Sequence, residues 1–288
     1  MQKFGENTLR NLAKGINTYF IIDYVEEFVS DLEEMMQEII VATKRTDISC
    51  SIQPFGAYSF LNISNQKEYI NIAVILNSDN LFKETNEIGK NFRFKNKRKK
   101  VSYIEQVKLL IVILLEKYFA HRVNIKMNHN SLLIDSLTIL GCNFRVFVFT
   151  QSFDNNELLT ISSYDYLPCS FNIDKYEENF AKKDALTNSN YSKMCNIIKS
   201  VCIDENISDD MLSIDFLLYN IDNMLLKGFI NEQLFNIFNE CKFMSYNNFV
   251  CMDSKNNVKL FTDRFLFPNG IYKTKVKFNK LVDFFLEN

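Results

Sequence analysis

The chain has 288 residues, of which 47% are hydrophobic, and this is enough to fill the core of one large domain or two small ones. Its 33 Lys and Arg residues against 35 Asp and Glu residues leave a formal net charge of -2, which excludes a globally basic nucleic-acid-binding protein. Seven cysteines without a C-x-x-C pair, and a first segment without a signal-peptide pattern, indicate a reducing compartment. We therefore expect an intracellular protein, nuclear or cytoplasmic, with no membrane contact.

Residues 8–13 are predicted to form a short helix or an extended arm, and the clearest predicted element is the long amphipathic helix that follows over residues 21–41. Apolar residues recur there at three- and four-residue intervals, and acidic residues fill the other face. The apolar face is expected to pack on a core. The acidic face is either an ordinary solvated surface or a surface for a partner.

A buried pair of strands is predicted next, over residues 52–60 and 68–76. The first apolar run breaks at Gly56-Ala57, which small and hydroxyl residues including Ser59 follow, and the second run is almost wholly apolar. The chain then reaches a basic run with two interleaved phenylalanines. Its cationic residues are Arg93, Lys95, Lys97, Arg98, Lys99 and Lys100. This run either contacts RNA phosphates and bases, acts as a nuclear import signal, or is a solvated loop.

A helix follows the basic run, and Ser102 with Glu105 fits a capping box at its start. Three short strands are predicted over residues 123–127, 132–140 and 144–150, with a hairpin turn at residues 141–143 between the last two. From about residue 190 the pattern is helical again. The helix over residues 191–201 carries Lys193 and Lys199, which are either phosphate contacts or surface lysines.

The turn and the strand after it resemble the polymerase-β-like nucleotidyltransferase superfamily. In that superfamily a Gly-Ser turn holds the triphosphate, and the next strand carries Asp-x-Asp, which binds two metal ions. Here Gly56-Ala57 stands in the turn, and Tyr69 and Asn71 stand at the metal positions. The third acidic position falls either on Asp135 or, in a second alignment, near Arg145, and the sequence leaves both open. Because Tyr and Asn cannot replace carboxylates as ligands of hard cations, we expect no metal site and no cofactor.

The resemblance implies an α+β fold with two parts. Residues 1–185 would form a nucleotidyltransferase-like mixed sheet with flanking helices, and residues 186–288 would form a helical lobe.

Several stretches together are most similar to the DZF domain of the interleukin-enhancer-binding-factor and zinc-finger RNA-binding proteins. They are residues 8–12, Gly56, and residues 72–76, 175–181 and 217–253. This resemblance implies a protein that does not transfer nucleotides and that pairs through its helical lobe with a second DZF-like protein in an RNA-binding complex.

The leading hypothesis is therefore a pseudoenzyme that acts as a dimerisation or scaffold subunit. One alternative is an active nucleotidyltransferase, of the poly(A) polymerase or oligonucleotide synthetase type, with a metal site shifted to Glu68, Asp79 and Asp135. A second alternative is a stand-alone RNA- or ribosome-associated factor that uses residues 93–100 as its electrostatic contact.

Overall fold

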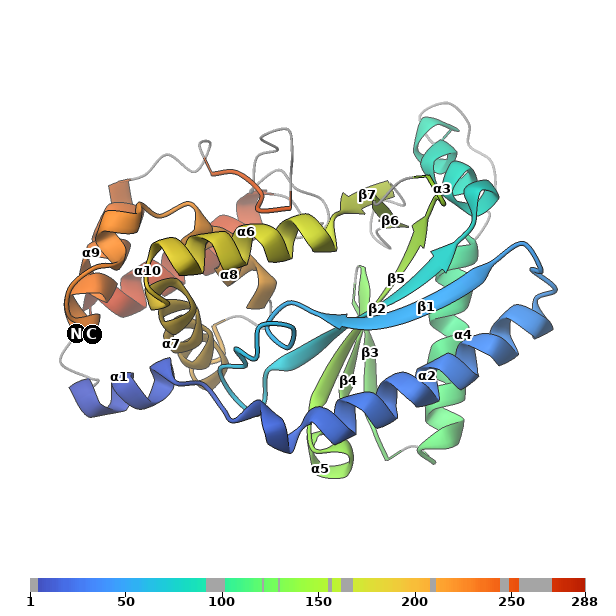
Figure 1. Cartoon of the computed structure of the whole chain (residues 1–288), viewed down its shortest axis with the longest axis horizontal. Helices are drawn as coiled ribbons and strands as arrows, with labels where there is room; N and C mark the ends of the chain where they lie inside the picture. The colour runs from blue at the N-terminus through green and yellow to red at the C-terminus, as the bar shows by residue number, and fades with distance from the viewer. Residues whose placement is uncertain are drawn as a thin grey trace. The chain divides into compact units, whose positions relative to one another are not determined.

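The computed structural model describes residues 5–91, 102–120, 122–128, 130–154, 157–161, 168–207, 211–243, 249–253 and 271–287. Within these residues the chain divides into two compact units (Figure 1). The sheet unit comprises Tyr19–Ser59 and Tyr69–Asn172, and the helical unit comprises Met1–Thr18, Phe60–Glu68 and Ile173–Asn288. The expected boundary at residue 185 falls inside a helix of the helical unit, which also takes in two earlier segments of the chain.

In the described part of the sheet unit, seven strands form one mixed sheet. They are β1 (Ser49–Phe55), β2 (Tyr69–Asn77), β3 (Asn124–Met127), β4 (Ser131–Asp135), β5 (Asn143–Gln151), β6 (Leu158–Ile161) and β7 (Pro168–Phe171). The order along the sheet is β1-β2-β5-β4-β3, with β6 beside β5 and β7 beside β6. β2 and β5 run parallel, and the other pairs are antiparallel. This sheet confirms the predicted fold class.

The parallel pair β2 and β5 lies at the centre of the core. Nearly all of their residues are buried, as their continuous apolar runs predict for a central parallel pair. The helices of this unit are α2 (Ile22–Ala42), α3 (Asp79–Asn91), α4 (Tyr103–Tyr118) and α5 (Leu137–Leu140), and a 3-10 turn, η1 (Thr18–Phe20), precedes α2.

Helix α2 confirms the long amphipathic helix. Its buried residues fall on one stripe, and the Phe28 ring stacks on Phe144 of β5 with 3.9 Å between ring centroids. The predicted start of α4 is also confirmed, because the Ser102 hydroxyl accepts a hydrogen bond from the Glu105 backbone N–H at 3.3 Å. This bond satisfies one of the free N–H groups at the helix start.

The prediction of a strand over residues 132–140 with a hairpin turn is wrong in its second half. β4 ends at Asp135, and the one-turn helix α5 follows before Gly141, which has a left-handed φ of 69°. The Asn143 side-chain oxygen accepts bonds from the backbone N–H groups of Ser136 and Leu137, each at 3.0 Å. These bonds satisfy N–H groups at the start of α5, so the chain leaves the sheet there instead of extending β4.

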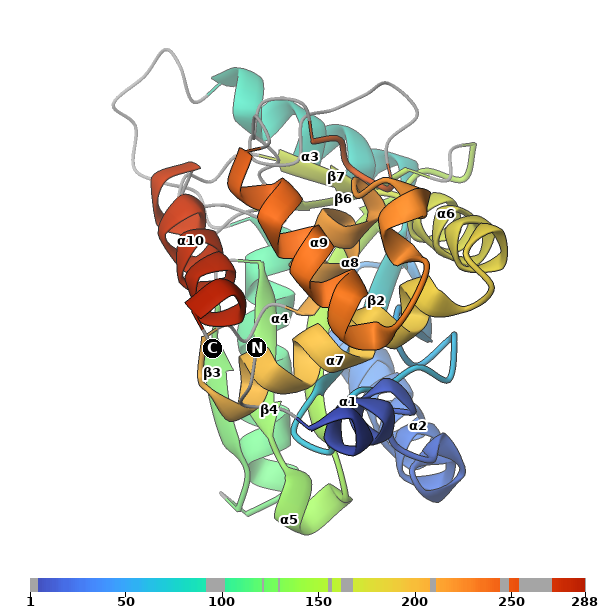
Figure 2. The same cartoon turned by 90° about the vertical axis from the view of Figure 1, so that its left-hand side faces the viewer.

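The helical unit contains α1 (Glu6–Ala13), α6 (Ile173–Leu186), α7 (Asn190–Asp204), α8 (Met211–Tyr219), η2 (Asn223–Leu226), α9 (Ile230–Phe243) and α10 (Ile271–Glu287). Helices α9 and α10 lie side by side, with Phe238 stacked on Phe285 at 4.2 Å (Figure 2). Phe229, Phe235 and Phe243 remain exposed. Apolar area is therefore available on this unit, and its pairing with a partner stays a prediction.

The loop of residues 60–68, which leads into β2, packs among these helices. The Phe60 ring stacks on Phe180 of α6 at 4.0 Å. The carbonyl oxygen of Ile63 accepts a bond from the Ile16 N–H at 2.9 Å, and the carbonyl oxygen of Ser64 accepts one from the Ser200 hydroxyl at 2.9 Å. The loop is thus anchored at several points along its length.

All seven cysteines are free thiols, and six of them are buried. Across the described residues, no helix combines the length and the apolar character that crossing a membrane requires.

Candidate active site

The residues that stand at the superfamily's metal-binding positions lie on one face of the sheet. Side chains alternate along a strand, so Tyr69 and Asn71 of β2 point to the same side. Asn71 pairs in register with Arg145 of β5, and Arg145 pairs in register with Leu133 of β4. Lys126 of β3 pairs with Leu133 and completes this row, while Asp135 pairs with Asn124 in a neighbouring row. Tyr69 and Asn71, which stand where the superfamily has metal-binding carboxylates, thus share one face of the sheet with Arg145 and Asp135.

Tyr69 and Asp135 are in direct contact: the Tyr69 hydroxyl donates a hydrogen bond to Oδ1 of Asp135. The other carboxylate oxygen, Oδ2, accepts a bond from Nζ of Lys126 at 2.9 Å and one from the Asn124 amide at 3.0 Å. These four residues form the Asp135 cluster.

The charge of Asp135 is fixed by this cluster. Partial burial raises the pKa of its carboxyl, but the hydrogen bonds from Tyr69, Lys126 and Asn124 and the positive charge of Lys126 outweigh that effect. The pKa of Asp135 is consequently lowered, and the group is ionised at neutral pH. Asp135 is therefore suited to hold Tyr69, Lys126 and Asn124 in place and poorly suited to accept a proton as a general base.

Arg145 lies beside the Asp135 cluster and is almost fully buried, with 6% of its surface exposed. Its Nε donates a hydrogen bond to the Ser131 hydroxyl at 3.0 Å, and its guanidinium group lies over the Phe147 ring at 5.0 Å. The two alignments that the sequence left open thus lead to the same face of the sheet: Arg145 is adjacent to Asn71, and Asp135 contacts Tyr69.

The turn after β1 has the backbone that the sequence predicts. Gly56 has a φ of 77°, a conformation that favours glycine. Ala57 is buried, with 6% of its surface exposed, and it offers no hydroxyl where the family has serine. Ser59 is exposed. Nucleotide contacts of this turn stay a prediction.

The carboxylates of the shifted-metal alternative are each bonded to neighbours within their own unit. Glu68 accepts bonds from the backbone N–H and the hydroxyl of Ser64, both at 2.7 Å. Asp79 accepts bonds from the Ser152 hydroxyl at 2.6 Å and the Phe153 N–H at 3.0 Å. Over the described ranges, no group of three or more His, Cys, Asp or Glu side chains could hold a metal ion. The residues present therefore do not fit the two-metal site of the superfamily.

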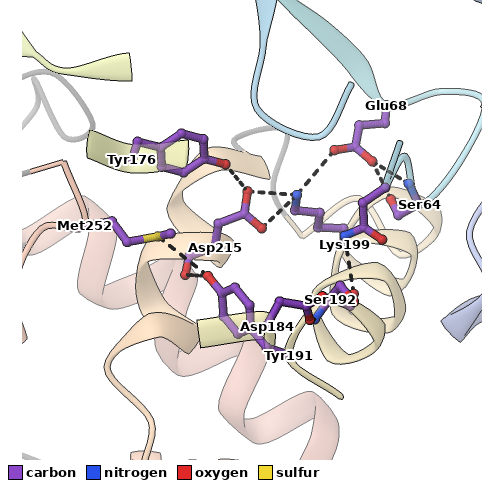
Figure 3. A network of polar contacts seen from close by, with 10 residues as sticks. Ser64, Glu68, Tyr176, Asp184, Tyr191, Ser192, Lys199, Asp215 and Met252 are labelled. Carbon is purple, nitrogen blue, oxygen red and sulfur yellow. Dashed lines mark hydrogen bonds and ion pairs between the residues drawn. The ribbon is translucent and has the colours of Figure 1, made fainter. Parts of the chain in front are cut away.

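Lys199 is buried, whereas a phosphate contact and a surface lysine, the two roles that the sequence offered, both place the side chain in solvent. Its ammonium lies 2.8 Å from the Asp215 carboxylate and 3.6 Å from that of Glu68, and its side chain is 1% exposed (Figure 3). The Tyr176 hydroxyl donates to the same Asp215 at 2.9 Å. A phosphate contact would require Lys199 to leave these partners.

The neighbouring Lys193 is exposed on α7 and lies 3.4 Å from the Asn190 side-chain oxygen. Its predicted phosphate contact stays a prediction. The basic run from Arg93 to Lys100 lies outside the described residues.

Comparison with solved structures identifies proteins with a similar fold. The chain is similar to the Rhodothermus marinus CdnE c-UMP-AMP synthase solved with Apcpp and Upnpp, with a TM-score of 0.61, 15% identity, and 97% of this chain and 95% of that one covered. It is similar to the Elizabethkingia meningoseptica CdnE cyclic dinucleotide synthase solved with GTP and Apcpp, with a TM-score of 0.59, 16% identity, and 91% and 92% covered. It is also similar to the STING-associated CdnE c-di-GMP synthase from Capnocytophaga granulosa, with a TM-score of 0.61, 15% identity, and 98% and 85% covered.

These likenesses show that the chain has the nucleotidyltransferase fold. No protein-family model and no curated protein matches the sequence. The prediction that the protein is not an enzyme is wrong, because the structures that it matches are synthases, two of them solved with nucleotides or analogues. The same matches do not support the DZF assignment or a role in an RNA-binding complex. That prediction rested on Tyr69 and Asn71, which bear on metal binding at two positions and do not report on the rest of the fold.

Proposed function

We propose that this protein is a nucleotidyltransferase of the oligonucleotide synthase type, which joins nucleoside triphosphates. The observation that carries the proposal is the length of the match: 97% of this chain aligns with 95% of a c-UMP-AMP synthase. Both the sheet unit and most of the helical unit lie within that match, so the likeness extends well beyond a shared sheet.

In such a reaction, a ribose hydroxyl of one nucleotide attacks the α-phosphorus of a nucleoside triphosphate. A phosphodiester bond forms, the bond to the β-phosphate breaks, pyrophosphate leaves, and the hydroxyl proton passes to solvent. Catalysis of phosphoryl transfer depends mainly on positioning and on stabilising the developing charge. The Asp135 cluster offers both, because it holds a tyrosine hydroxyl, an amide and an ammonium group in fixed places.

Among the described residues, no group of three or more His, Cys, Asp or Glu side chains could hold a divalent cation. The role of Asp135 is to position Tyr69 and Lys126.

The test is a transfer assay on the purified full chain. All four labelled nucleoside triphosphates are supplied with Mg²⁺ or Mn²⁺, with and without an RNA primer, and the products are resolved by chromatography. The site variant is Asp135→Ala. The matched control is Asp31→Ala, because Asp31 on α2 also accepts a tyrosine hydroxyl bond, from Tyr118 at 3.2 Å, on the other side of the sheet.

We expect product from the wild type and from Asp31→Ala, and at least a hundredfold less from Asp135→Ala, the size of effect that lost positioning has on such reactions. If the wild type makes no product with any nucleotide and either metal ion, the proposal fails. Full activity of Asp135→Ala would remove the Asp135 cluster from the active site.

A further inference from the structure

Backbone pairing holds Asp135 on one side only. It is the last residue of β4 and pairs with Asn124 of β3, but the ladder between β4 and β5 ends one residue earlier, at Ile134 and Phe144. Its carboxylate nevertheless accepts the hydroxyl of Tyr69 from β2, on the far side of β5. The position of Asp135 relative to β5 therefore depends on other bonds.

Asn143, the first residue of β5, supplies such bonds. Its side-chain oxygen accepts the backbone N–H groups of Ser136 and Leu137, each at 3.0 Å, directly after Asp135. The Ser136 hydroxyl donates to the carbonyl oxygen of Cys142 at 2.7 Å, directly before Asn143. These bonds tie the end of β4 to the start of β5 and close the turn between the two strands at its base.

Asn143 also lies between the two residues that share the hydrogen bond. It pairs with Tyr69 in the parallel register of β2 and β5. On its other side, the β4–β5 register continued by one residue places Asp135 opposite it. Because neighbouring strands lie about 4.8 Å apart, the backbones of Tyr69 and Asp135 are separated by about 10 Å. Their side chains bridge this span only if the backbone at each end is fixed.

The bonds that close the turn are made by buried residues: Asn143 is 8% exposed and Ser136 is 1% exposed. A buried N–H group that loses its acceptor is costly, so without the Asn143 oxygen the backbone after Asp135 shifts toward other partners. A displacement of about 1 Å is enough to break a hydrogen bond. The bond from Tyr69 to Asp135 therefore depends on the Asn143 side chain, which takes no part in that bond itself.

We propose that Asn143, together with Ser136, is a positioning residue of the Asp135 cluster: it fixes the end of β4 so that the Asp135 carboxylate meets the Tyr69 hydroxyl. Asn143 acts on nucleotide transfer through these two residues, and its contribution to catalysis rests on the proposed function. The positioning itself is independent of the reaction, so it can be measured without substrate.

The first test is the pKa of Asp135 in the full chain, from NMR titration of its carboxyl carbon. Asn143→Ala should raise this pKa, because the hydrogen bond from Tyr69 favours the ionised carboxylate. Tyr69→Phe should add little to the increase in the Asn143→Ala background, although it raises the pKa of Asp135 when made alone. An undiminished effect of Tyr69→Phe would refute the positioning role, since the bond would then have survived without Asn143.

Asn220→Ala is the matched control, because Asn220 makes the same kind of bonds in the helical unit. Its side-chain oxygen accepts the Val250 N–H at 2.7 Å, and its amide donates to the carbonyl oxygens of Phe216 and Val250. Its loss should lower the melting temperature, as Asn143→Ala does, and leave the pKa of Asp135 unchanged. An equal rise of that pKa in both variants would assign the effect to general loss of stability and refute the proposal.

Melting curves show whether each variant is folded. If Asn143→Ala is unfolded, Ser136→Ala replaces it in the titration, because it keeps Asn143 and removes only the hydroxyl bond to Cys142. This variant should raise the pKa of Asp135 by a smaller amount. An unchanged pKa of Asp135 in whichever of the two variants is used would overturn the proposal.

The transfer assay tests the contribution of Asn143 to catalysis. Asn143→Ala should lower kcat at least about tenfold, as expected for lost positioning. Asn143→Asp keeps an oxygen acceptor for Ser136 and Leu137 and should restore part of kcat. Unchanged kcat in Asn143→Ala would refute this contribution.

The outcomes separate the two proposals. A raised pKa of Asp135 in Asn143→Ala, with no transfer product from the wild type, would support the positioning role and refute the proposed function. Product from the wild type, with an unchanged pKa of Asp135 in Asn143→Ala, would do the reverse.

Discussion

The ammonium group of Lys199 lies 2.8 Å from the carboxylate of Asp215, and each side chain is 1% exposed. The pair joins helices α7 and α8, and Glu68 adds a second carboxylate from the loop that leads into β2. Removing one partner of a buried ion pair leaves an uncompensated charge in a place that water cannot solvate. The pair therefore links the stability of the helical unit to the anchoring of that loop.

Lys199→Met should lower the free energy of unfolding by about 3–5 kcal/mol, because Asp215 and Glu68 then remain buried without their cation. Urea unfolding at neutral pH, followed by circular dichroism, measures the change. Lys193→Met is the matched control on the same helix, and its exposed side chain predicts a change below about 0.5 kcal/mol. Equal effects of the two substitutions would contradict the buried-pair interpretation.

Stability should fall in alkaline solution. Burial lowers the pKa of Lys199, but Asp215 and Glu68 raise it more, so the net shift is upward. Burial also raises the pKa of Tyr176, Tyr191 and Cys195 well above their ordinary values. A group whose pKa is raised by folding contributes fully to the free energy of unfolding at pH values below its unfolded-state pKa. The lowest of these unfolded-state pKa values is about 8.5, and each contribution is lost as pH rises through the folded-state pKa.

The free energy of unfolding, measured in urea from pH 7 to pH 11, should therefore decline above about pH 8.5. The slope is about 1.4 kcal/mol per pH unit for each group that is protonated only in the folded state. Tyr176→Phe removes one such group and should reduce the slope, whereas Tyr19→Phe, at an exposed tyrosine, should not. A flat profile up to pH 11 would refute the shifted pKa values.

Much of the fold could be predicted from the sequence, because local patterns determine it. The apolar stripe of α2, the buried run of β2 and the serine that caps α4 all follow from residues close together in the chain. α5 could not be predicted, since the apolar run through Leu137 and Leu140 fits a strand equally well. The turn depends on bonds that span it, among them those from Ser136 and Leu137 to Asn143, and such bonds are not visible in a run of apolar residues.

The candidate site was predictable only residue by residue. Tyr69 and Asp135 each stood out, but their hydrogen bond joins residues 66 positions apart, and no spacing rule connects them. Lys199 had the helix spacing of a surface lysine, while its partner Asp215 lies on another helix. Burial of a charge depends on tertiary partners, which periodicity does not report.

Tyr69→Phe should raise the pKa of Asp135, because it removes a hydrogen bond that favours the ionised carboxylate. Titration of the carboxyl carbon by NMR measures the shift, and the transfer assay should show a matching loss of product. Tyr118→Phe is the control: it removes the equivalent bond to Asp31 and should raise the pKa of that residue alone. If the midpoint of Asp135 stays where it is in Tyr69→Phe, the bond does not hold that carboxylate ionised.

Gly15→Ala should destabilise the helical unit through the loop of residues 60–68. Gly15 has a φ of 63°, and an added Cβ would lie 2.5 Å from the carbonyl oxygen of Ile63. That oxygen already accepts the Ile16 N–H at 2.9 Å, so moving it disturbs one anchor of the loop. Strain of this kind costs about 1–3 kcal/mol, which urea unfolding detects.

Gly5→Ala separates this steric effect from a general preference for glycine. Gly5 has a negative φ, and an added Cβ there would meet nothing within 4 Å, so the free energy of unfolding should change by less than about 0.5 kcal/mol. Proteolysis gives a second measurement, because Gly15→Ala should speed cleavage within residues 60–68 while Gly5→Ala does not. Equal stability of both variants would show that the Ile63 carbonyl group moves aside without a cost in folding free energy.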